Sequence, residues 1–130
     1  MHRRLVLLAS IASLAASCAP QPPAGPPTVV IFFTADSAQL DDSAVGLIRA
    51  AAETARANPA SYVHVRGFAA SDTGSGAFNA ALSRTRALAV RDALVDRGVE
   101  PRRILMEWRG TTQYQDMPRE ARRVEITVGG

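Results

Sequence analysis

One arginine of this chain lies where a helix should bury apolar side chains. At 100° per residue, Arg86 shares a helical face with three apolar residues, Leu82, Val90 and Ala93. A guanidinium on such a face must extend its charged head to solvent, pair with an internal carboxylate or hold an anionic ligand. Arg86 is therefore the first candidate for binding chemistry.

The rest of the chain contains few residues that could serve in catalysis or bind a metal ion. Beyond the first seventeen residues the chain has one histidine, His64, and one cysteine, Cys18, which is too small a set for a His/Cys metal site or a Cys-His nucleophile. All fifteen basic residues are arginine, so a Walker lysine and a Schiff base are excluded. The glycines of Ser71 to Gly76 indicate a turn. We expect a protein that is not an enzyme and has no cofactor or metal.

The first seventeen residues are typical of an export signal. Arg3 and Arg4 precede an apolar stretch of twelve residues, Leu5 to Ala16, whereas a membrane-spanning helix needs roughly 20. We therefore predict a signal peptide over residues 1–17. Removing it leaves 13 of the fifteen arginines against 12 acidic residues, so the mature chain is close to neutral and nucleic-acid binding is not expected.

Cys18 follows small residues, an arrangement that resembles the bacterial lipobox, with Ala15 in the place where leucine is usual. This resemblance predicts that Cys18 is lipidated; the alternative is an incidental cysteine beside an ordinary cleavage site. Residues 18–27 contain five of the eight prolines and form a predicted linker of about 30 Å at most. Ala19 after the cysteine favours the outer membrane over the inner one.

Residues 28–130 are enough for one small domain. Strands are predicted over 28–34, 62–66, 103–108 and 123–128 from β-branched content and alternation. One helix is predicted from an Asp41 or Asp42 cap to Asn58, and a longer one from about Ala77 to a Gly98 C-cap. The order predicts an α+β sandwich, with two helices packed on one face of a four-stranded mixed sheet.

An ordered set of motifs spans this domain. It comprises Gly67-Phe68-Ala69, a turn at Gly74, Phe78-Asn79, Leu82-Ser83, Arg86-Ala87 and Val90, flanked by residues 33–40 and by Arg122-Arg123-Val124-Glu125-Ile126. Together they resemble the OmpA-like domain family. The resemblance implies non-covalent binding of peptidoglycan through the meso-diaminopimelate of its stem peptide. In such a site Arg86 binds the ligand carboxylate, backbone amides around Asn79 add donors, and Arg122 belongs to the closing motif.

The sequence departs from the family pattern at the residue that binds the ligand ammonium. Counted forward from Gly67, the position of the family aspartate is Ala70; counted back from Arg86, it is Ser71. Asp72 is the only carboxylate in this loop. Either Asp72 takes over the role or ammonium recognition is lost. Phe68 stands where histidine is common and is predicted to form a wall of the site, and Asp36 either flanks the site or serves as a turn residue.

The predicted protein is an outer-membrane lipoprotein with a periplasmic domain that binds the cell wall. Its predicted partners are the peptidoglycan stem peptide, the membrane through a lipid anchor, and envelope proteins. The rival hypothesis keeps the fold but makes the domain a protein-interaction module of an envelope or secretion complex. Arg86 also has a purely structural alternative, pairing with Asp36 or Asp72.

Overall fold

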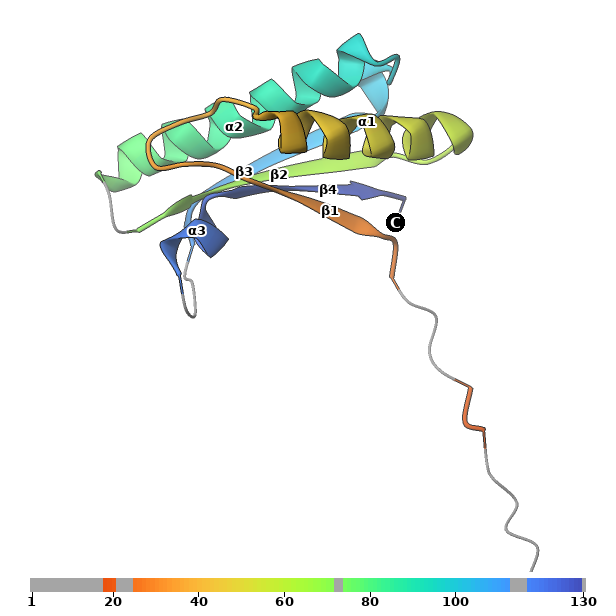
Figure 1. Ribbon diagram of the computed structural model, residues 1–130, viewed down its shortest axis with the longest axis horizontal. Helices are drawn as coiled ribbons and strands as arrows, with labels where there is room; N and C mark the ends of the chain where they lie inside the picture. The colour runs from red at the N-terminus through yellow and green to blue at the C-terminus, as the bar shows by residue number, and fades with distance from the viewer. Residues whose placement is uncertain (1–17, 21–24, 72–73, 113–116, 130) are drawn as a thin grey trace, which may run out of the picture.

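The computed structural model describes residues 18–20, 25–71, 74–112 and 117–129. Four strands and two long helices follow one another in the predicted order, with two additional short helices (Figure 1). The elements are β1 (Thr28–Phe32), α1 (Asp42–Ala57), β2 (Val63–Ala70), α2 (Gly76–Asp96), η1 (Pro101–Arg103), β3 (Ile104–Thr112), α3 (Pro118–Ala121) and β4 (Arg123–Val128).

The strands form one mixed sheet in the order β1-β4-β2-β3. β4 pairs antiparallel with both β1 and β2, whereas β2 and β3 are parallel and are joined by the crossover helix α2. Alternation places Val63 and Val65 in the core, and His64 and Arg66 on the opposite face. Both long helices cover one face of the sheet, so the predicted α+β fold is confirmed.

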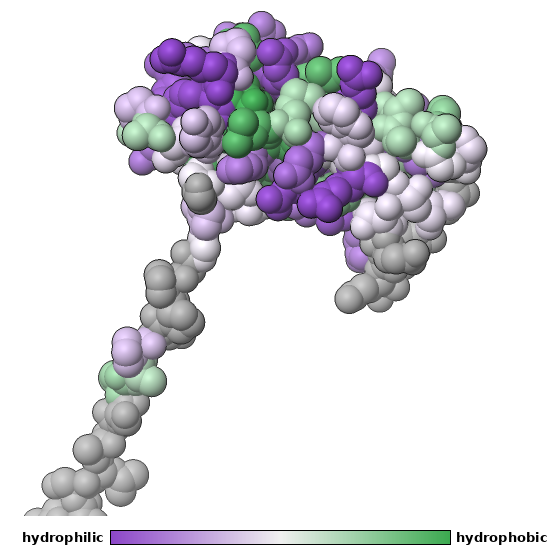
Figure 2. All heavy atoms as spheres, turned by 180° about the vertical axis from the view of Figure 1, so that it is seen from behind, coloured by the Kyte–Doolittle hydropathy of each residue, from purple (hydrophilic) through white to green (hydrophobic). Residues whose placement is uncertain are grey.

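Different segments of the chain lie at the two ends of the sheet. Figure 1 shows the chain entering β1 at the same end as the C-terminus, while the β1–α1 loop and α3 lie at the other end. Viewed from behind, polar side chains are interleaved with apolar ones over the exposed surface (Figure 2). The segment that leads to the N-terminus therefore leaves the domain away from the β1–α1 loop.

Helix α1 begins and packs as its sequence predicts. The Asp41 side chain caps it by accepting a hydrogen bond from the Ala44 amide at 2.7 Å. Its buried face is mostly alanine, which lets the helix lie close to the sheet; these residues are Ala44, Ile48, Ala51, Ala52 and Ala55.

Helix α2 buries a different stripe from the predicted one. Val90 and Arg86 are fully buried, but Leu82 and Ala93 are only partly so. The buried stripe is polar in its first half and apolar in its second, and consists of Asn79, Ser83, Arg86, Ala87, Val90 and Leu94. The helix ends at Asp96, and Gly98 follows its Arg97 cap with a φ of +90°, the left-handed conformation that the sequence predicts there.

The second and third strands are longer than the sequence predicts. The second strand was predicted to end at residue 66, but residues 67–70 continue β2 and pair with β3, with an irregularity between Gly67 and Ala69. Gly67 permits this because its backbone lies directly against α2: a Cβ there would be 2.1 Å from the carbonyl oxygen of Ser83. The close approach brings the end of β2 beside Arg86.

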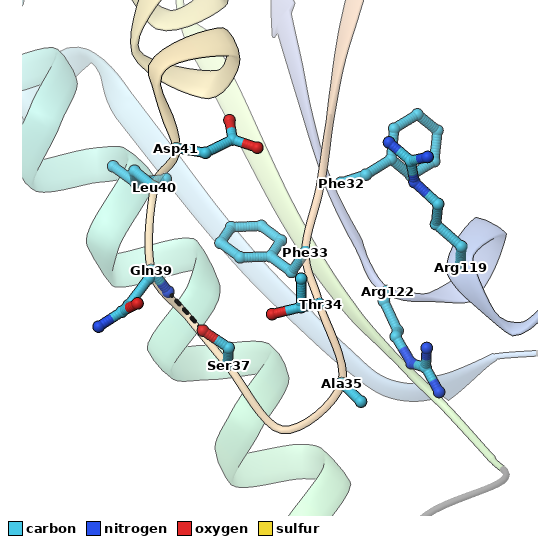
Figure 3. A pocket seen from close by; sticks show the side chains of 10 residues that line it. All are labelled: Phe32, Phe33, Thr34, Ala35, Ser37, Gln39, Leu40, Asp41, Arg119 and Arg122. Carbon is cyan, nitrogen blue, oxygen red and sulfur yellow. Dashed lines mark hydrogen bonds between the residues drawn. The ribbon is translucent and has the colours of Figure 1, made fainter.

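The short helix α3 was not predicted, because four residues give no periodic signal. Pro118 occupies its first turn, where a missing N–H costs nothing. The helix places Arg119 and Arg122 beside the end of β1 (Figure 3).

Candidate ligand site around Arg86

Arg86 is a fully buried cation that joins three segments of the chain. Its side chain is 0% exposed. Nε donates to the Ser37 carbonyl at 2.8 Å, Nη2 to the Thr34 carbonyl at 3.0 Å, and Nη1 to the Phe68 carbonyl at 3.1 Å. The guanidinium therefore holds the β1–α1 loop against the end of β2. Of the three alternatives for this guanidinium, extension of its charged head to solvent is therefore excluded.

The electrostatic environment of Arg86 disfavours its charge. Burial, followed by the nearby charge of Arg122, lowers the pKa of Arg86 from its ordinary value to about 10, and Asp36 offsets part of this effect. Among the described residues no carboxylate forms an ion pair with Arg86. Asp36 therefore acts on it at longer range than an ion pair, and backbone carbonyl dipoles supply the direct contacts. The guanidinium also lies over the face of the Phe33 ring, with its carbon 5.2 Å from the ring centroid, a distance at which a cation and an aromatic face attract each other.

The β1–α1 loop is shaped to present carbonyl groups to Arg86. Asp36 is the only non-glycine residue with positive φ in the described part of the chain, at 52°. The Ser37 amide donates back to the Thr34 carbonyl at 3.4 Å, and the Ser37 hydroxyl accepts the Gln39 amide at 3.1 Å. Asp36 is exposed at the tip of this turn. It is thus a turn residue that also lies near the candidate site.

Phe68 contributes to the site differently from the prediction. Its carbonyl accepts from Arg86, but its ring lies under the Arg123 guanidinium, 4.2 Å from the carbon to the ring centroid. Because neighbouring Gly67 faces α2, the alternation of β2 directs the Phe68 ring to the other face of the sheet. The ring is therefore not a wall beside Arg86.

The start of α2 is largely committed to its own hydrogen bonds. The Asn79 amide donates to the Ser75 carbonyl at 2.9 Å and the Phe78 amide to the Ser75 hydroxyl at 3.2 Å. Asn79 is 2% exposed; its Nδ2 donates to the Thr111 hydroxyl at 3.3 Å, while its Oδ1 is buried with no hydrogen-bond partner among the described residues. Ser71 is exposed in the turn after β2. Asp72 lies outside the described residues, so its role stays a prediction.

A pocket of about 580 Å³ lies on the outer side of the β1–α1 loop (Figure 3). Thr34 and Ser37, whose carbonyl groups accept hydrogen bonds from Arg86, also line this pocket. The loop therefore lies between the pocket and the buried guanidinium. Its lining is Phe32, Phe33, Thr34, Ala35, Ser37, Gln39, Leu40, Asp41, Arg119 and Arg122. Sequence reasoning missed Arg119, for which Pro118 at a helix start was the available signal.

The described residues offer neither a metal site nor a membrane-spanning helix. They contain no group of three or more His, Cys, Asp or Glu residues that could hold a metal ion. None of the helices in the ranges that the structure describes has the length and apolar content to cross a membrane.

The fold and the site define a small α+β domain of the OmpA type. Residues 32–125 match the model of the OmpA family, and the chain belongs to this family. It is 36% identical over 104 residues to outer membrane protein 40 of Porphyromonas gingivalis. This match covers 75% of the chain but only 27% of that relative.

Solved structures share the fold at low sequence identity. The peptidoglycan-associated lipoprotein from Burkholderia pseudomallei has a TM-score of 0.69 at 23% identity, covering 76% of this chain and 88% of that one. The OmpA-like domain of FopA1 from Francisella tularensis has a TM-score of 0.70 at 22% identity, covering 78% and 71%. The C-terminal domain of Helicobacter pylori MotB has a TM-score of 0.66 at 25% identity, covering 76% and 81%.

Proposed function

We propose that this protein is an outer-membrane lipoprotein whose periplasmic domain binds peptidoglycan non-covalently and tethers the membrane to the cell wall. The ligand is the meso-diaminopimelate residue of the stem peptide, and the domain acts by binding rather than by catalysis. Membership of the OmpA family supports the kind of partner. The residues of this chain support the chemistry.

The observation that carries the proposal is a buried guanidinium that forms no ion pair with any carboxylate of the described residues. An unpaired buried charge is costly, and a carboxylate that forms charge-assisted hydrogen bonds with it recovers much of that cost. Arg86 has five N–H groups, and its three hydrogen bonds to carbonyls use three of them, one on each nitrogen. One N–H on each terminal nitrogen therefore suits the two oxygens of a ligand carboxylate.

The ligand carries an ammonium group next to that carboxylate, so the site also needs an acceptor with negative charge. Asp36 is exposed and close enough to Arg86 to influence its pKa. Asp72, in the turn after β2, is the second candidate. In the proposed site one or both of these carboxylates receive the ammonium, and Arg122, Asn79 and Ser71 border it.

The anchor is proposed to be a lipid on Cys18 after removal of residues 1–17, which lie outside the described residues. Cys18 is exposed. The chain enters β1 at the end of the domain away from the β1–α1 loop (Figure 1). A lipid-anchored domain would therefore direct its ligand site away from the membrane and toward the wall.

Cosedimentation with purified sacculi tests the proposal, using the mature chain with Cys18→Ser. Arg86→Gln should abolish sedimentation, whereas Arg91→Gln, which removes a charge from a partly exposed position of the same helix, should leave it unchanged. Because Arg86 is buried, thermal unfolding must show that Arg86→Gln is folded at the assay temperature. Asp36→Asn is a second variant, at an exposed residue, and should weaken binding without unfolding the domain. Equal sedimentation of Arg86→Gln and the unsubstituted chain would refute the assigned site.

A protein-interaction module is the second candidate. It is favoured by the three carbonyl contacts of Arg86, which give this residue a structural role even without a ligand. This alternative predicts no sedimentation with sacculi for the unsubstituted chain. It also predicts a stoichiometric envelope protein in a pulldown.

A further inference from the structure

The end of the domain where the chain enters β1 carries more arginine than acid. Figure 1 shows that α1 and α2 both end there, at the same end as the C-terminus. Strongly hydrophilic side chains gather at this end in Figure 2, where the N-terminal segment leaves the domain. We define the entry surface as residues 56–62 and 96–103. Its charged residues are Arg56, Asp96, Arg97, Glu100, Arg102 and Arg103.

Two of these arginines are already compensated by their neighbours. Arg103 Nη2 donates to the carbonyls of Ala55 and Asn58 at 2.7 and 2.8 Å, so it offsets the partial negative charge at the end of α1. Arg102 Nε pairs with the Glu100 carboxylate at 2.7 Å. Neither residue is therefore the source of a free positive charge.

Arg56 and Arg97 keep their charge available. Arg56 is exposed in the last turn of α1, and Arg97 is the partly exposed cap of α2. The Arg56 side chain lies across the end of α2, with its Cδ 3.6 Å from the position of a Cβ added to Gly98. Neither arginine side chain forms an ion pair or a hydrogen bond within the described ranges. Asp96 offsets only one of the two charges, so the entry surface is positive.

An exposed aromatic side chain lies on the same surface. Tyr62 is 52% exposed, and its carbonyl accepts from the Gly129 amide at 2.8 Å, which fixes it beside the end of β4. Together with Arg102 and Arg103 it lines a pocket of about 450 Å³. Tyrosine combines an apolar ring with a polar hydroxyl, and this combination is enriched where a protein meets lipid headgroups.

We infer that the entry surface docks on an anionic phospholipid surface, with Arg56 and Arg97 at the phosphates and Tyr62 in the headgroup layer. The inference rests on the proposed function, because the lipid on Cys18 brings this end of the domain to the membrane. A linker of about 30 Å at most keeps the entry surface at high effective concentration over the lipid, so a weak attraction is sufficient. Docking then holds the Arg86 site toward the wall.

The single cysteine of the chain provides the test, because Cys18 of the mature chain can be coupled to vesicles through a maleimide lipid. Tyr62→Trp combined with Trp108→Phe leaves one tryptophan, on the entry surface. Vesicles of phosphatidylglycerol that contain brominated lipid should quench its fluorescence, whereas phosphatidylcholine vesicles with the same brominated fraction should quench it much less. Raised salt should reverse the quenching on phosphatidylglycerol.

Arg56→Gln in this reporter chain should lower the ratio of docked to undocked domain about fivefold, and Arg97→Gln should act in the same direction. Arg49→Gln is the matched control. Arg49 is exposed on the same face of α1, two turns before Arg56 and therefore about 10 Å further from the entry surface. It should leave the quenching unchanged. Equal quenching of Arg49→Gln and Arg56→Gln, or of the reporter on the two kinds of vesicle, would overturn the inference.

The outcomes separate this inference from the proposed function. Coupling at Cys18 replaces the natural anchor, so the vesicle result does not depend on lipidation in cells. Metabolic labelling with radioactive palmitate tests the anchor itself, with Cys18→Ser as the unlabelled control. If the chain takes up no label, the proposed anchor is wrong, while quenching that Arg56→Gln reduces still supports the docking surface.

Discussion

Gly67→Ala tests the close approach of β2 and α2 on which the site depends. An added Cβ would lie 2.1 Å from the Ser83 carbonyl oxygen, whereas ordinary contacts begin at 3.4 Å, and both groups are held by regular secondary structure. Relief requires the strand and the helix to separate. We expect a loss of about 3 kcal/mol in the free energy of unfolding. For a domain of this size that corresponds to a fall in Tm of roughly 12–24 °C.

Thermal unfolding followed by circular dichroism measures this effect, with Gly46→Ala as the control. Gly46 is exposed on α1, and a Cβ there has no atom within 4 Å. Alanine in place of this helical glycine should stabilise the domain by about 0.5–1 kcal/mol. If Gly67→Ala unfolds within a few degrees of the unsubstituted chain while Gly46→Ala behaves as expected, the proposed contact between β2 and α2 is wrong.

Two further predictions concern the helix cap and the buried charge. Asp41→Ala should lower the free energy of unfolding by about 1 kcal/mol, because it leaves the Ala44 amide without its cap. Asp42→Ala is the control: it removes the same charge but not that hydrogen bond, so it should lower the free energy of unfolding less. Equal losses for the two variants in urea titrations would contradict the assigned cap. Because the pKa of Arg86 is lowered to about 10, the unfolded chain binds more protons than the folded one as the pH rises above 10, and the free energy of unfolding contributed by this group rises there. Arg86→Gln should remove this rise. If the free energy of unfolding changes with pH in the same way for the two proteins above pH 10, the pKa of Arg86 is not lowered by folding.

Much of the architecture follows from local patterns. Neighbouring residues by themselves predict the alternation at Val63 and Val65 and a capping aspartate at Asp41 or Asp42. The structure confirms the alternation and shows that Asp41 is the cap. The ends of β2 and β3 were missed because their small residues, such as Ala69 and Ala70, have weak strand preference. Their pairing with Thr111 and Thr112 is decided by the sheet rather than by local sequence.

The candidate site was only partly predictable for a related reason. Helical spacing identified Arg86 as anomalous, but its partners are backbone carbonyls, which every residue possesses and no sequence pattern marks. Two of them, at Thr34 and Ser37, come from positions 52 and 49 residues earlier in the chain. The direction of the Phe68 ring likewise depended on where β2 ends. Tertiary structure therefore determined how these residues meet.

The central claim is that the buried guanidinium of Arg86 receives a carboxylate of diaminopimelate. A crystal structure of the domain with the wall tetrapeptide tests it most directly. The account predicts carboxylate oxygens about 2.7–2.9 Å from the terminal nitrogens of Arg86, with the ligand ammonium beside Asp36 or Asp72. A tetrapeptide bound elsewhere, with Arg86 still donating only to the carbonyls of Thr34, Ser37 and Phe68, would contradict it.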